Sequence, residues 1–571
     1  MKFAHLPENP TLIDPPAWNL QWLTPLRCRV IFALLLAAGF LSHLQYLHVN
    51  CPIDLLGDEA QYWDWSRNLD WSYYSKGPLV ALIIRASCAV FGDTMQAVRY
   101  PALLLGVGTS IFFYLTARRL SGSDRLALGT VALTHVVPMF IAGSVLMTID
   151  PPYFFCWAAA TYFAVLAIFE RKNWAWIVAG AFIGVGFLAK YAALLWWVGI
   201  LIFLLLNRPP TRDRKVAVAS GDSVAASRFL FPGIGALVSL LCTLPVVFWN
   251  HRHDWVSFRH VARQTGAEGG GLSHGNLLEF IGGQVGVVGP TLAVLIIGSI
   301  FWALNRKDKD QRYVFLATLG LFFLGCNFVV SLVAKVQQNW PAPAYFSLII
   351  LTAFFIADRL QSIYTWRRWR GLVWATVALG VIATPILHDI SLVFPIVSKF
   401  KISPEKIDFT TKARGWEELG AFVSQKRREV QWRMDAFAEF PLSRKQRADF
   451  ELKGPLPFIL CDDYLQTAEM AFYVEGQPKT YYAGSYFTDA KRLTQYDMWE
   501  DRRLDQRELI GRDAVYIGKG GELPPDIPAA FERISERIVL PIYARGYEAK
   551  SFKVWLCYGF KGMQRPTKVD H

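Results

Sequence analysis

The sequence predicts a multi-spanning α-helical membrane protein of about 11 transmembrane helices, followed by a C-terminal soluble α/β domain. Three observations lead to this fold class. Hydrophobic residues make up 53% of the 571 residues and charged residues only 18%, whereas typical soluble domains carry about 25% charged residues. Aromatic residues reach 15%, including 21 Trp, and Trp favours the headgroup level of a bilayer. Apolar runs long enough to span a bilayer recur as far as Leu387, and only the residues beyond it are rich in charge.

The apolar runs give the expected spans in chain order, at about 17–25 residues for each spanning helix. Residues 174–206 are too many for one span and are interrupted by Lys190, so we expect two short helices that turn at this lysine. The polar, Pro-rich N-terminal stretch shows no cleavable signal pattern. The other expected spans are residues 30–47, 97–117, 126–147, 152–169, 229–249, 284–304, 313–334, 341–357 and 371–387.

Lysine and arginine counts in the short loops predict the orientation of the spans. With the N-terminus inside, the inner segments hold 21 Lys and Arg, and the outer loops before the last span hold nine. The net charge of +13 is therefore attributed to a membrane surface and not to nucleic acid. An odd number of spans places the end of the chain outside. We expect a membrane domain at residues 1–389 with outer loops at 49–96 and 250–283, and an outer domain at 390–571.

The end of the chain has the composition of a soluble domain. Residues 399–571 carry 29 Lys and Arg and 26 Asp and Glu. The pattern predicts buried strands at 458–461 and 514–517 and a helix at 416–430. Cys461 and Cys557 lie in this domain. They would form a disulfide only in an oxidising compartment, and two unpaired buried thiols are at least as consistent with the pattern.

Ionisable residues gather where the predicted spans end on the outer side, because charges inside a span are costly. The first outer loop, residues 57–77, reads GDEAQYWDWSRNLDWSYYSKG. Its adjacent acids Asp58 and Glu59 could act as a base or metal ligands, or could simply cap a helix. Lys76, 18 residues after Asp58, could neutralise a phosphate.

Two further charged residues stand at outer helix ends. Lys190 could bind phosphate or extend to the lipid headgroups. Asp150 precedes Pro151 and Pro152, a position that is also typical of a helix cap.

A metal site is an open alternative in the outer loops. The histidines of the loop at 250–283, among them His253, could bind a metal, or could belong to a polar loop that contacts headgroups. Asp58 and Glu59 could hold a divalent cation together with His253, but no spacing in the sequence requires one. No other cofactor is expected.

An ordered set of short motifs carries a resemblance to a known family. In chain order these are GDEA at 57–60, YYSKGP at 73–78, TIDPP at 148–152, GVGFLAKY at 184–191, WNHRHDWVSF at 249–258 and NWPAP at 339–343. Together they resemble the bacterial family 39/83 glycosyltransferases of the GT-C class, whose relatives include protein O-mannosyltransferases and the aminoarabinose and galacturonate transferases of lipid A modification. The outer domain is also similar to this family, at GWEEL 415–419, AEMAFY 468–473 and QYDMW 495–499.

The resemblance implies a GT-C fold in the bacterial inner (cytoplasmic) membrane, with periplasmic outer loops and a periplasmic C-terminal domain. It implies a glycosyltransferase that uses a polyprenyl-phosphate sugar donor and a lipid or cell-envelope acceptor. By this analogy Asp58 is the catalytic carboxylate with Glu59 beside it, and Asp150 has a supporting role. Lys76 and Lys190 would meet the donor phosphate. The other candidate substrate-binding residues are Arg67, Tyr74, Lys335, Asn339 and Trp340.

Two departures from the family pattern leave the sugar and the acceptor open. Relatives often have Glu-Lys-Pro or His-Pro-Pro where this chain has Ser-Lys-Gly-Pro at 75–78. Aminoarabinose transferases carry a Lys-Leu-Pro-Thr-Tyr pattern where this chain has residues 335–340, and its phosphate-binding tyrosine has no clear match here.

The residue types fit this chemistry without the family. A lipid-phosphate donor needs cations for its leaving phosphate, and a hydroxyl acceptor needs a base. One carboxylate base acting in a direct attack predicts inversion at the anomeric carbon. The alternative is a membrane transporter or flippase of a polyprenyl-linked or lipid substrate. Such proteins often show internal repeats and charges near the bilayer midplane, and neither is visible in the sequence.

Overall fold

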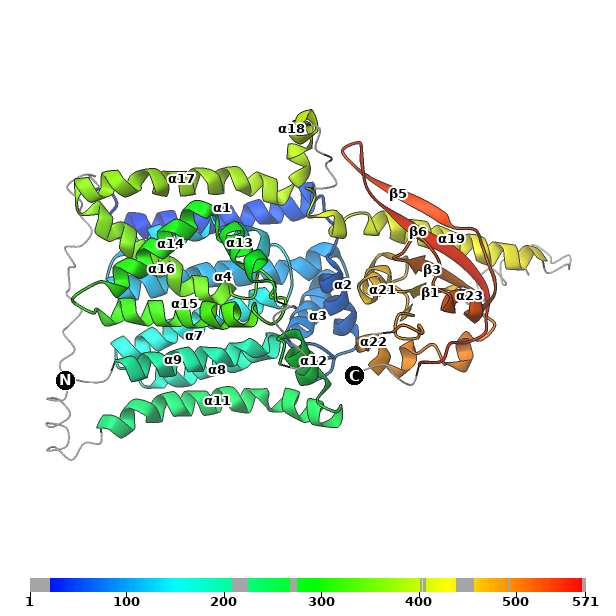
Figure 1. Cartoon of the computed structure of the whole chain (residues 1–571), viewed down its shortest axis with the longest axis horizontal. Coiled ribbons are helices and arrows are strands. Elements are labelled where there is room, and N and C mark those ends of the chain that lie inside the picture. The colour runs from blue at the N-terminus through cyan, green and yellow to red at the C-terminus, as the bar shows by residue number, and fades with distance from the viewer. Residues whose placement is uncertain are drawn as a thin grey trace. The chain divides into compact units, whose positions relative to one another are not determined.

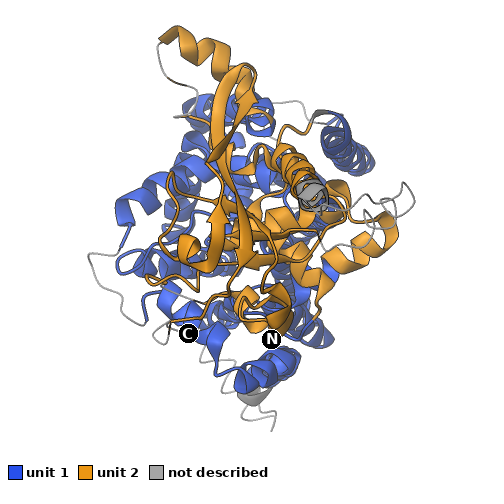
Figure 2. Ribbon diagram, turned by 90° about the vertical axis from the view of Figure 1, so that its right-hand side faces the viewer, with its two compact units in different colours: residues 1–50, 70–83, 99–388 blue, residues 51–69, 84–98, 389–571 orange. Residues whose placement is uncertain are grey.

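The computed structural model describes residues 21–207, 224–267, 275–400, 403, 407–437, 456–490 and 493–566. The chain forms two compact units (Figure 2). Unit 1 comprises Met1–Asn50, Asp70–Ile83 and Arg99–His388, and unit 2 comprises Cys51–Leu69, Ile84–Val98 and Asp389–His571. Unit 2 therefore contains the predicted C-terminal domain and also takes in two segments of the first outer loop.

Unit 1 is built from helices that run alongside one another (Figure 1). Its most buried helix is α16, in which 13 consecutive residues from Pro343 to Phe355 are buried. The helices of unit 1, with α3 and α4 reaching into unit 2, are α1 (Pro25–Gln45), η2 (Tyr46–Asn50), α3 (Leu79–Phe91), α4 (Met95–Ser121), α5 (Asp124–Thr134), α6 (Pro138–Gly143), α7 (Asp150–Phe169), α8 (Trp174–Ala189), η3 (Tyr191–Leu194), α9 (Leu195–Leu206), α11 (Val224–Arg252), α12 (Val256–Gln264), α13 (Leu277–Val288), α14 (Pro290–Leu304), α15 (Gln311–Val330), α16 (Ala342–Leu360) and α17 (Ile363–His388).

Seven of the described helices are long and apolar enough to cross a membrane, and the bent pair α13 and α14 would make an eighth span. The prediction of a multi-pass membrane protein is confirmed, but by helix length the count is below eleven. Residues 126–147 do not form one helix, because α5 ends at Thr134 and α6 begins at Pro138. The run at 174–206 is divided at Lys190 into the short helices α8 and α9, as the sequence predicted.

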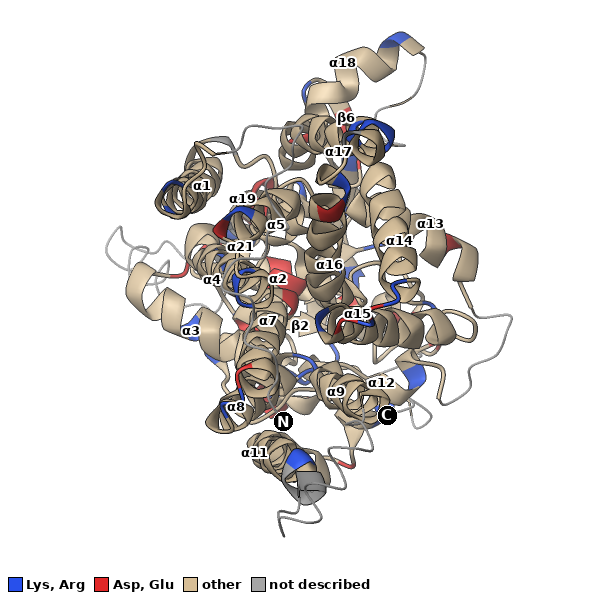
Figure 3. Cartoon of the chain, turned by 90° about the vertical axis from the view of Figure 1, so that its left-hand side faces the viewer, with Lys and Arg blue, Asp and Glu red and all other residues tan. Residues whose placement is uncertain are grey.

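Seen along the helices, most of the ribbon of unit 1 carries no charge (Figure 3), and several of its charged residues lie at helix ends. Asp124, at the start of α5, pairs with Arg29 of α1 at 3.2 Å and with Arg118 of α4 at 2.9 Å. Glu170 follows α7 and pairs with Arg119 at 3.0 Å. These contacts bring together, at one end of the bundle, several of the segments predicted to lie on the same, inner side.

Unit 2 contains a mixed sheet with the strand order β2-β1-β3-β6-β4, and β5 pairs with β6. β1 runs parallel to β2 and β3, and β6 is antiparallel to β3, β4 and β5. The expected strands at 458–461 and 514–517 correspond to β1 and β3, and the expected helix at 416–430 is part of α19. The α/β prediction is confirmed. The elements are α2 (Gly57–Arg67), η5 (Ile390–Val393), α18 (Phe394–Val397), η6 (Ser398–Phe400), η8 (Thr411–Ala413), α19 (Trp416–Phe437), β1 (Phe458–Cys461), α21 (Tyr464–Tyr473), β2 (Thr480–Tyr482), α22 (Gln495–Met498), η9 (Glu500–Arg502), η10 (Arg507–Leu509), β3 (Ala514–Gly518), α23 (Asp526–Ala530), β4 (Phe531–Ile534), β5 (Ile538–Ala544) and β6 (Tyr547–Phe560).

Cys461 and Cys557 are both free and buried. They lie on the two strands that flank β3, where Cys461 is paired with Ile517 and Cys557 with Ala514. Each also belongs to a different hydrophobic core cluster of the domain. Two strand spacings of about 4.8 Å each are more than a disulfide can bridge, so the unpaired-thiol alternative is the one that the fold adopts.

Candidate functional site

Three predicted site residues from distant parts of the chain meet in unit 1. Lys190 Nζ lies 2.9 Å from Asp150 Oδ1, and the two side chains are 13% and 24% exposed. Asn339 donates from Nδ2 to the other carboxylate oxygen of Asp150. The Lys190 ammonium also lies 5.5 Å from the ring centre of Tyr153. A partly exposed lysine held by a carboxylate in this way can offer its remaining protons to an anionic ligand.

Local backbone structure explains how these side chains reach one another. Lys190 is the residue between α8 and η3, and its extended φ of −148° and ψ of 122° interrupt the helix. Asp150 is the first residue of α7, where an acidic side chain suits the positive end of the helix dipole. Because the helix is interrupted at Lys190, the side chain of this residue at the end of α8 can reach the start of α7.

Asn339 is positioned by the segment that precedes α16. Asn276 binds the backbone of Val336 at both its N–H and its carbonyl, at 3.0 and 3.1 Å. Gln284 of α13 donates to the carbonyl of Gln338 at 3.1 Å. These bonds fix the segment at 336–338, and with it the position from which Asn339 binds Asp150.

The loop that carries Lys76 packs against the end of α8. A Cβ built on Gly77 would lie 2.3 Å from the carbonyl oxygen of Leu188, so only glycine allows this approach. Ser72 and Tyr191 hydroxyls lie 3.2 Å apart on the far side of the break. The loop therefore contacts the residues on both sides of Lys190.

The same loop, residues 70–78, also forms hydrogen bonds with α11 and α12. Trp249 donates from Nε1 to Asp70 Oδ2 at 2.7 Å. Ser257 donates from Oγ to the carbonyl of Tyr73 at 2.7 Å. The motif at 249–258 thus supports the loop at 70–78.

The other predicted binding residues of unit 1 have different surroundings. Tyr74 is buried and its ring lies 5.2 Å from that of His260. Lys335 is 66% exposed and lies 3.8 Å from Glu279. Trp340 is half-buried.

In unit 2, the adjacent acids Asp58 and Glu59 have different environments. Asp58 is exposed in the first turn of α2. Glu59 is fully buried and accepts a hydrogen bond from the N–H of Leu56 at 3.0 Å. Glu59 therefore caps its own helix, which was the alternative considered for this pair, and of the two acids only Asp58 is exposed.

Asp64 is a buried acid that we did not single out from the sequence. It accepts bonds from Arg67 at 2.6 Å, from Arg502 at 3.2 Å and from the Tyr496 hydroxyl at 3.0 Å. Arg67 also donates to the carbonyl of Gln477 at 2.7 Å. The spacing of Asp64 and Arg67 on a helix could have revealed their pairing, but nothing in the sequence indicates Arg502 as a partner.

A metal site is not formed by the described part of the chain, in which no group of three or more His, Cys, Asp and Glu side chains could hold a metal ion. His253 instead stacks on Trp249, with ring centres 4.0 Å apart, and its Nδ1 lies 2.8 Å from the Trp249 carbonyl oxygen. Asp58, Glu59 and His253, which the sequence offered as metal ligands, therefore do not form such a group.

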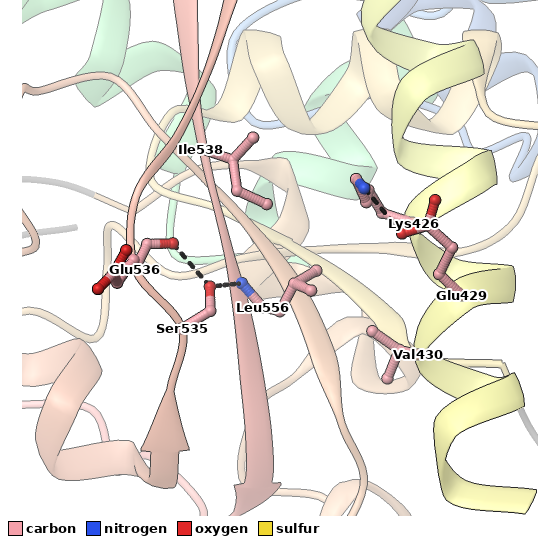
Figure 4. A pocket seen from close by; sticks show the side chains of 7 residues that line it. All are labelled: Lys426, Glu429, Val430, Ser535, Glu536, Ile538 and Leu556. Carbon is pink, nitrogen blue, oxygen red and sulfur yellow. Dashed lines mark hydrogen bonds and ion pairs between the residues drawn. The ribbon is translucent and has the colours of Figure 1, made fainter. Parts of the chain in front are cut away.

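Unit 2 also contains a small pocket of about 250 Å³ beside α19 (Figure 4). Lys426 and Glu429 line one side and form an ion pair of 2.7 Å. Ser535, which follows β4, and Leu556 of β6 line the opposite side (Figure 4). None of the predicted site residues lines this pocket.

The side chain of Asp54, four residues before Asp58, has a raised pKa. It accepts a hydrogen bond from the N–H of Trp416 at the start of α19, at 2.7 Å. Burial raises the pKa of Asp54 from 3.8 to about 6, and the negative charge of Glu418 adds to the rise. The folded protein therefore keeps this proton to a higher pH than the unfolded chain does.

We expect the free energy of unfolding to fall by up to roughly 3 kcal/mol as the pH rises from about 4 to about 6, because the folded state must then ionise a buried Asp54. Asp54→Asn should remove this part of the pH dependence while keeping an acceptor for the Trp416 N–H. Thermal unfolding of the purified protein between pH 4 and 7 measures the effect. An identical pH dependence in both proteins would contradict the assignment to Asp54.

Comparisons with known proteins find relatives of part of this sequence. A family model described as dolichyl-phosphate-mannose-protein mannosyltransferase matches residues 75–249. The lipid A galacturonosyltransferase RgtD of Rhizobium johnstonii is 30% identical over 312 residues, which cover 53% of this chain and 61% of the relative. An undecaprenyl phosphate-alpha-4-amino-4-deoxy-L-arabinose arabinosyl transferase of Pseudomonas fluorescens is 27% identical over 206 residues, which cover 34% of this chain and 35% of the relative. The matches thus span less than two thirds of either relative.

Solved structures share the fold over nearly the whole chain. The crystal structure of ArnT from Cupriavidus metallidurans in the apo state has a TM-score of 0.51 and 15% sequence identity, and covers 92% of this chain and 97% of that one. The same protein bound to undecaprenyl phosphate has a TM-score of 0.54 and 14% identity, and covers 94% and 98%. In sequence, part of this chain is thus similar to membrane glycosyltransferases, and in fold nearly the whole chain is similar to ArnT, as its ordered motifs predicted.

Proposed function

We propose that this protein transfers a sugar from a polyprenyl-phosphate donor to a lipid or other cell-envelope acceptor at the periplasmic face of the inner membrane. The contacts of Asp150 with Lys190 and with Asn339 carry the proposal. A charge at the broken end of a membrane helix marks a functional site, and a lysine there can neutralise a lipid phosphate. The two sequence relatives, a lipid A galacturonosyltransferase and an undecaprenyl phosphate-alpha-4-amino-4-deoxy-L-arabinose arabinosyl transferase, support the donor and acceptor classes.

The roles of individual residues follow from chemistry and from the family resemblance. Asp58 takes the proton of the acceptor hydroxyl, whose oxygen attacks the anomeric carbon. The bond from that carbon to the phosphate oxygen breaks, and the electron pair leaves with polyprenyl phosphate. Lys190 and Lys76 stabilise the phosphate charge, and Asp150 orients Lys190. A single direct displacement gives a product of inverted anomeric configuration.

We further propose the orientation that the loop charges favour. The N-terminus is then cytoplasmic, and the loops at 49–96 and 250–283 and the domain at 390–571 are periplasmic. Proteolysis of sealed inner-membrane vesicles of known orientation reports which loops are accessible.

A donor panel tests the reaction class. Purified protein in lipid vesicles is given radiolabelled polyprenyl-phosphate sugars, or the matching nucleotide sugars, together with extracted envelope lipid. We expect label in the lipid from one polyprenyl-phosphate sugar, no label from nucleotide sugars, and no label in vesicles without protein. Inverted configuration of the new bond supports direct attack. Movement of labelled donor across the bilayer without transfer would overturn the proposal in favour of a flippase.

A further inference from the structure

The segment just before Asp58 forms hydrogen bonds with residues more than 350 positions later in the chain. The N–H of Asp54 donates to the carbonyl of Ala413 at 2.7 Å. Arg414 donates to the carbonyl of Pro52 at 2.9 Å. The N–H of Leu55 donates to the Tyr473 hydroxyl at 2.7 Å. Within unit 2, the backbone groups of the residues just before α2 thus take hydrogen-bond partners from the C-terminal part of the chain.

Side-chain packing continues this attachment into α2. A Cβ built on Gly57 would lie 2.7 Å from Leu465 Cβ, so the start of α2 lies directly on α21. Trp63 packs edge-on against Phe472 of α21, with ring centres 4.8 Å apart. One face of α2 is therefore occupied by a helix of the C-terminal part.

The other end of α2 is held by a buried charge cluster. Asp64 is fully buried, and Arg502 is 3% exposed. Arg502 lies 3.2 Å from Asp64 and also donates to the carbonyl of Thr480 at 3.0 Å. Tyr496 donates to the second carboxylate oxygen of Asp64 at 3.0 Å. Removing one member of a buried pair leaves an uncompensated charge, so this end of α2 is firmly specified.

These contacts fix the backbone on both sides of Asp58 and leave its side chain exposed. We infer that the C-terminal domain positions the base: Tyr473, through Leu55, and Tyr496, through Asp64, are positioning residues for Asp58. The inference rests on the proposed function of Asp58. Because a misplacement of about 1 Å can cost roughly a hundredfold in rate, loss of one positioning bond should lower turnover and not donor binding.

A matched pair of tyrosines tests this inference. Tyr473 accepts from the N–H of Leu55 at 2.7 Å, and Tyr486 accepts from the N–H of Leu504 at 3.1 Å. Both leucines are fully buried. Tyr473→Phe and Tyr486→Phe each remove one hydroxyl acceptor from a buried backbone donor in the same unit, but only Tyr473 contacts the Asp58 segment.

We expect Tyr473→Phe to lower kcat roughly tenfold at an unchanged KM for the donor, and Tyr486→Phe to leave both constants near wild type, although both lower the thermal midpoint to a similar extent. Hydrogen exchange by mass spectrometry should show faster exchange of the amides at 52–58 in Tyr473→Phe only. Equal kcat values and equal exchange at 52–58 in the two variants would overturn the inference.

Asp54 supplies a second test by conservative rescue. Asn at this position retains an acceptor for the Trp416 N–H, and Ala does not. We expect Asp54→Ala to lower kcat and Asp54→Asn to restore most of it. If wild-type protein transfers no sugar from any donor, the proposed function fails, and the exchange at 52–58 still decides whether the domain holds this segment. If Asp58→Asn abolishes transfer while Tyr473→Phe behaves like Tyr486→Phe, the positioning role alone fails.

Discussion

Replacing Asp58 by Asn is expected to lower kcat for sugar transfer by roughly 10³-fold, with membrane insertion and thermal stability unchanged. General base catalysis contributes about 10²–10⁴-fold, and an amide cannot take the acceptor proton. Because Asp58 is exposed in the first turn of α2, we expect this change to cause no large loss of stability through packing. Transfer from the labelled donor to envelope lipid is the measurement.

Glu59→Gln is the matched control for this prediction. It removes one carboxylate at the adjacent position, but Gln can still accept the Leu56 N–H, as it does in other capping boxes. We expect Glu59→Gln to keep at least about a third of wild-type kcat, because a capping change of this kind costs less than about 1 kcal/mol. A comparable loss in both variants would assign the chemistry to the acid pair, and an active Asp58→Asn would remove Asp58 from the base role.

Replacing Lys190 by Met is expected to raise the KM for the donor and lower kcat, for a combined loss of roughly 10²–10³-fold in kcat/KM. The lysine lies 2.9 Å from Asp150, so Met removes the charge that would meet the leaving phosphate and leaves Asp150 to repel it. The loss of one such electrostatic contact costs about 10²–10³-fold in kcat. Inhibition by added polyprenyl phosphate should weaken in parallel. The measurement is steady-state transfer at varied donor concentration.

Lys172→Met is the control, because Lys172 lies before the opposite end of α8 and pairs with Glu170 at 2.8 Å in an exposed position. It should behave as wild type, since exposed ion pairs contribute about 0–1 kcal/mol. Lys190→Arg should retain part of the activity through its charge. Unchanged donor KM and unchanged inhibition in Lys190→Met would mean that Lys190 only holds Asp150.

The sequence was informative wherever one residue interrupts a strong local pattern. Lys190 breaks an apolar run, and the helix does end there because a charge and an extended backbone are both disfavoured inside a span. Asp150 before two prolines correctly indicated the start of α7. The strands β1 and β3 were predicted because short apolar runs between polar residues are typical of buried parallel strands.

The sequence was less informative where no charged residue marks the break between two helices. Residues 126–147 contain no Asp, Glu, Lys or Arg, and hydropathy alone joins them into one span. In the structure α5 ends at Thr134, and Pro138, which has no N–H to donate, begins α6. The sequence also did not show that Asp58 is exposed and Glu59 is buried. This difference depends on which of the two side chains turns back to accept the Leu56 N–H.

By itself, the sequence predicted a multi-pass membrane protein with a GT-C type of fold and an α/β domain at its C-terminus, and it singled out the acids and lysines of the candidate site. Local composition and ordered motifs are sufficient for that, because hydropathy and helix breaks act over a few residues. Only the tertiary structure decided which of these residues meet: Asn339 reaches Asp150 across 189 positions, and Arg502 reaches Asp64 across 438. Such contacts depend on how whole helices pack, and no local pattern records that packing.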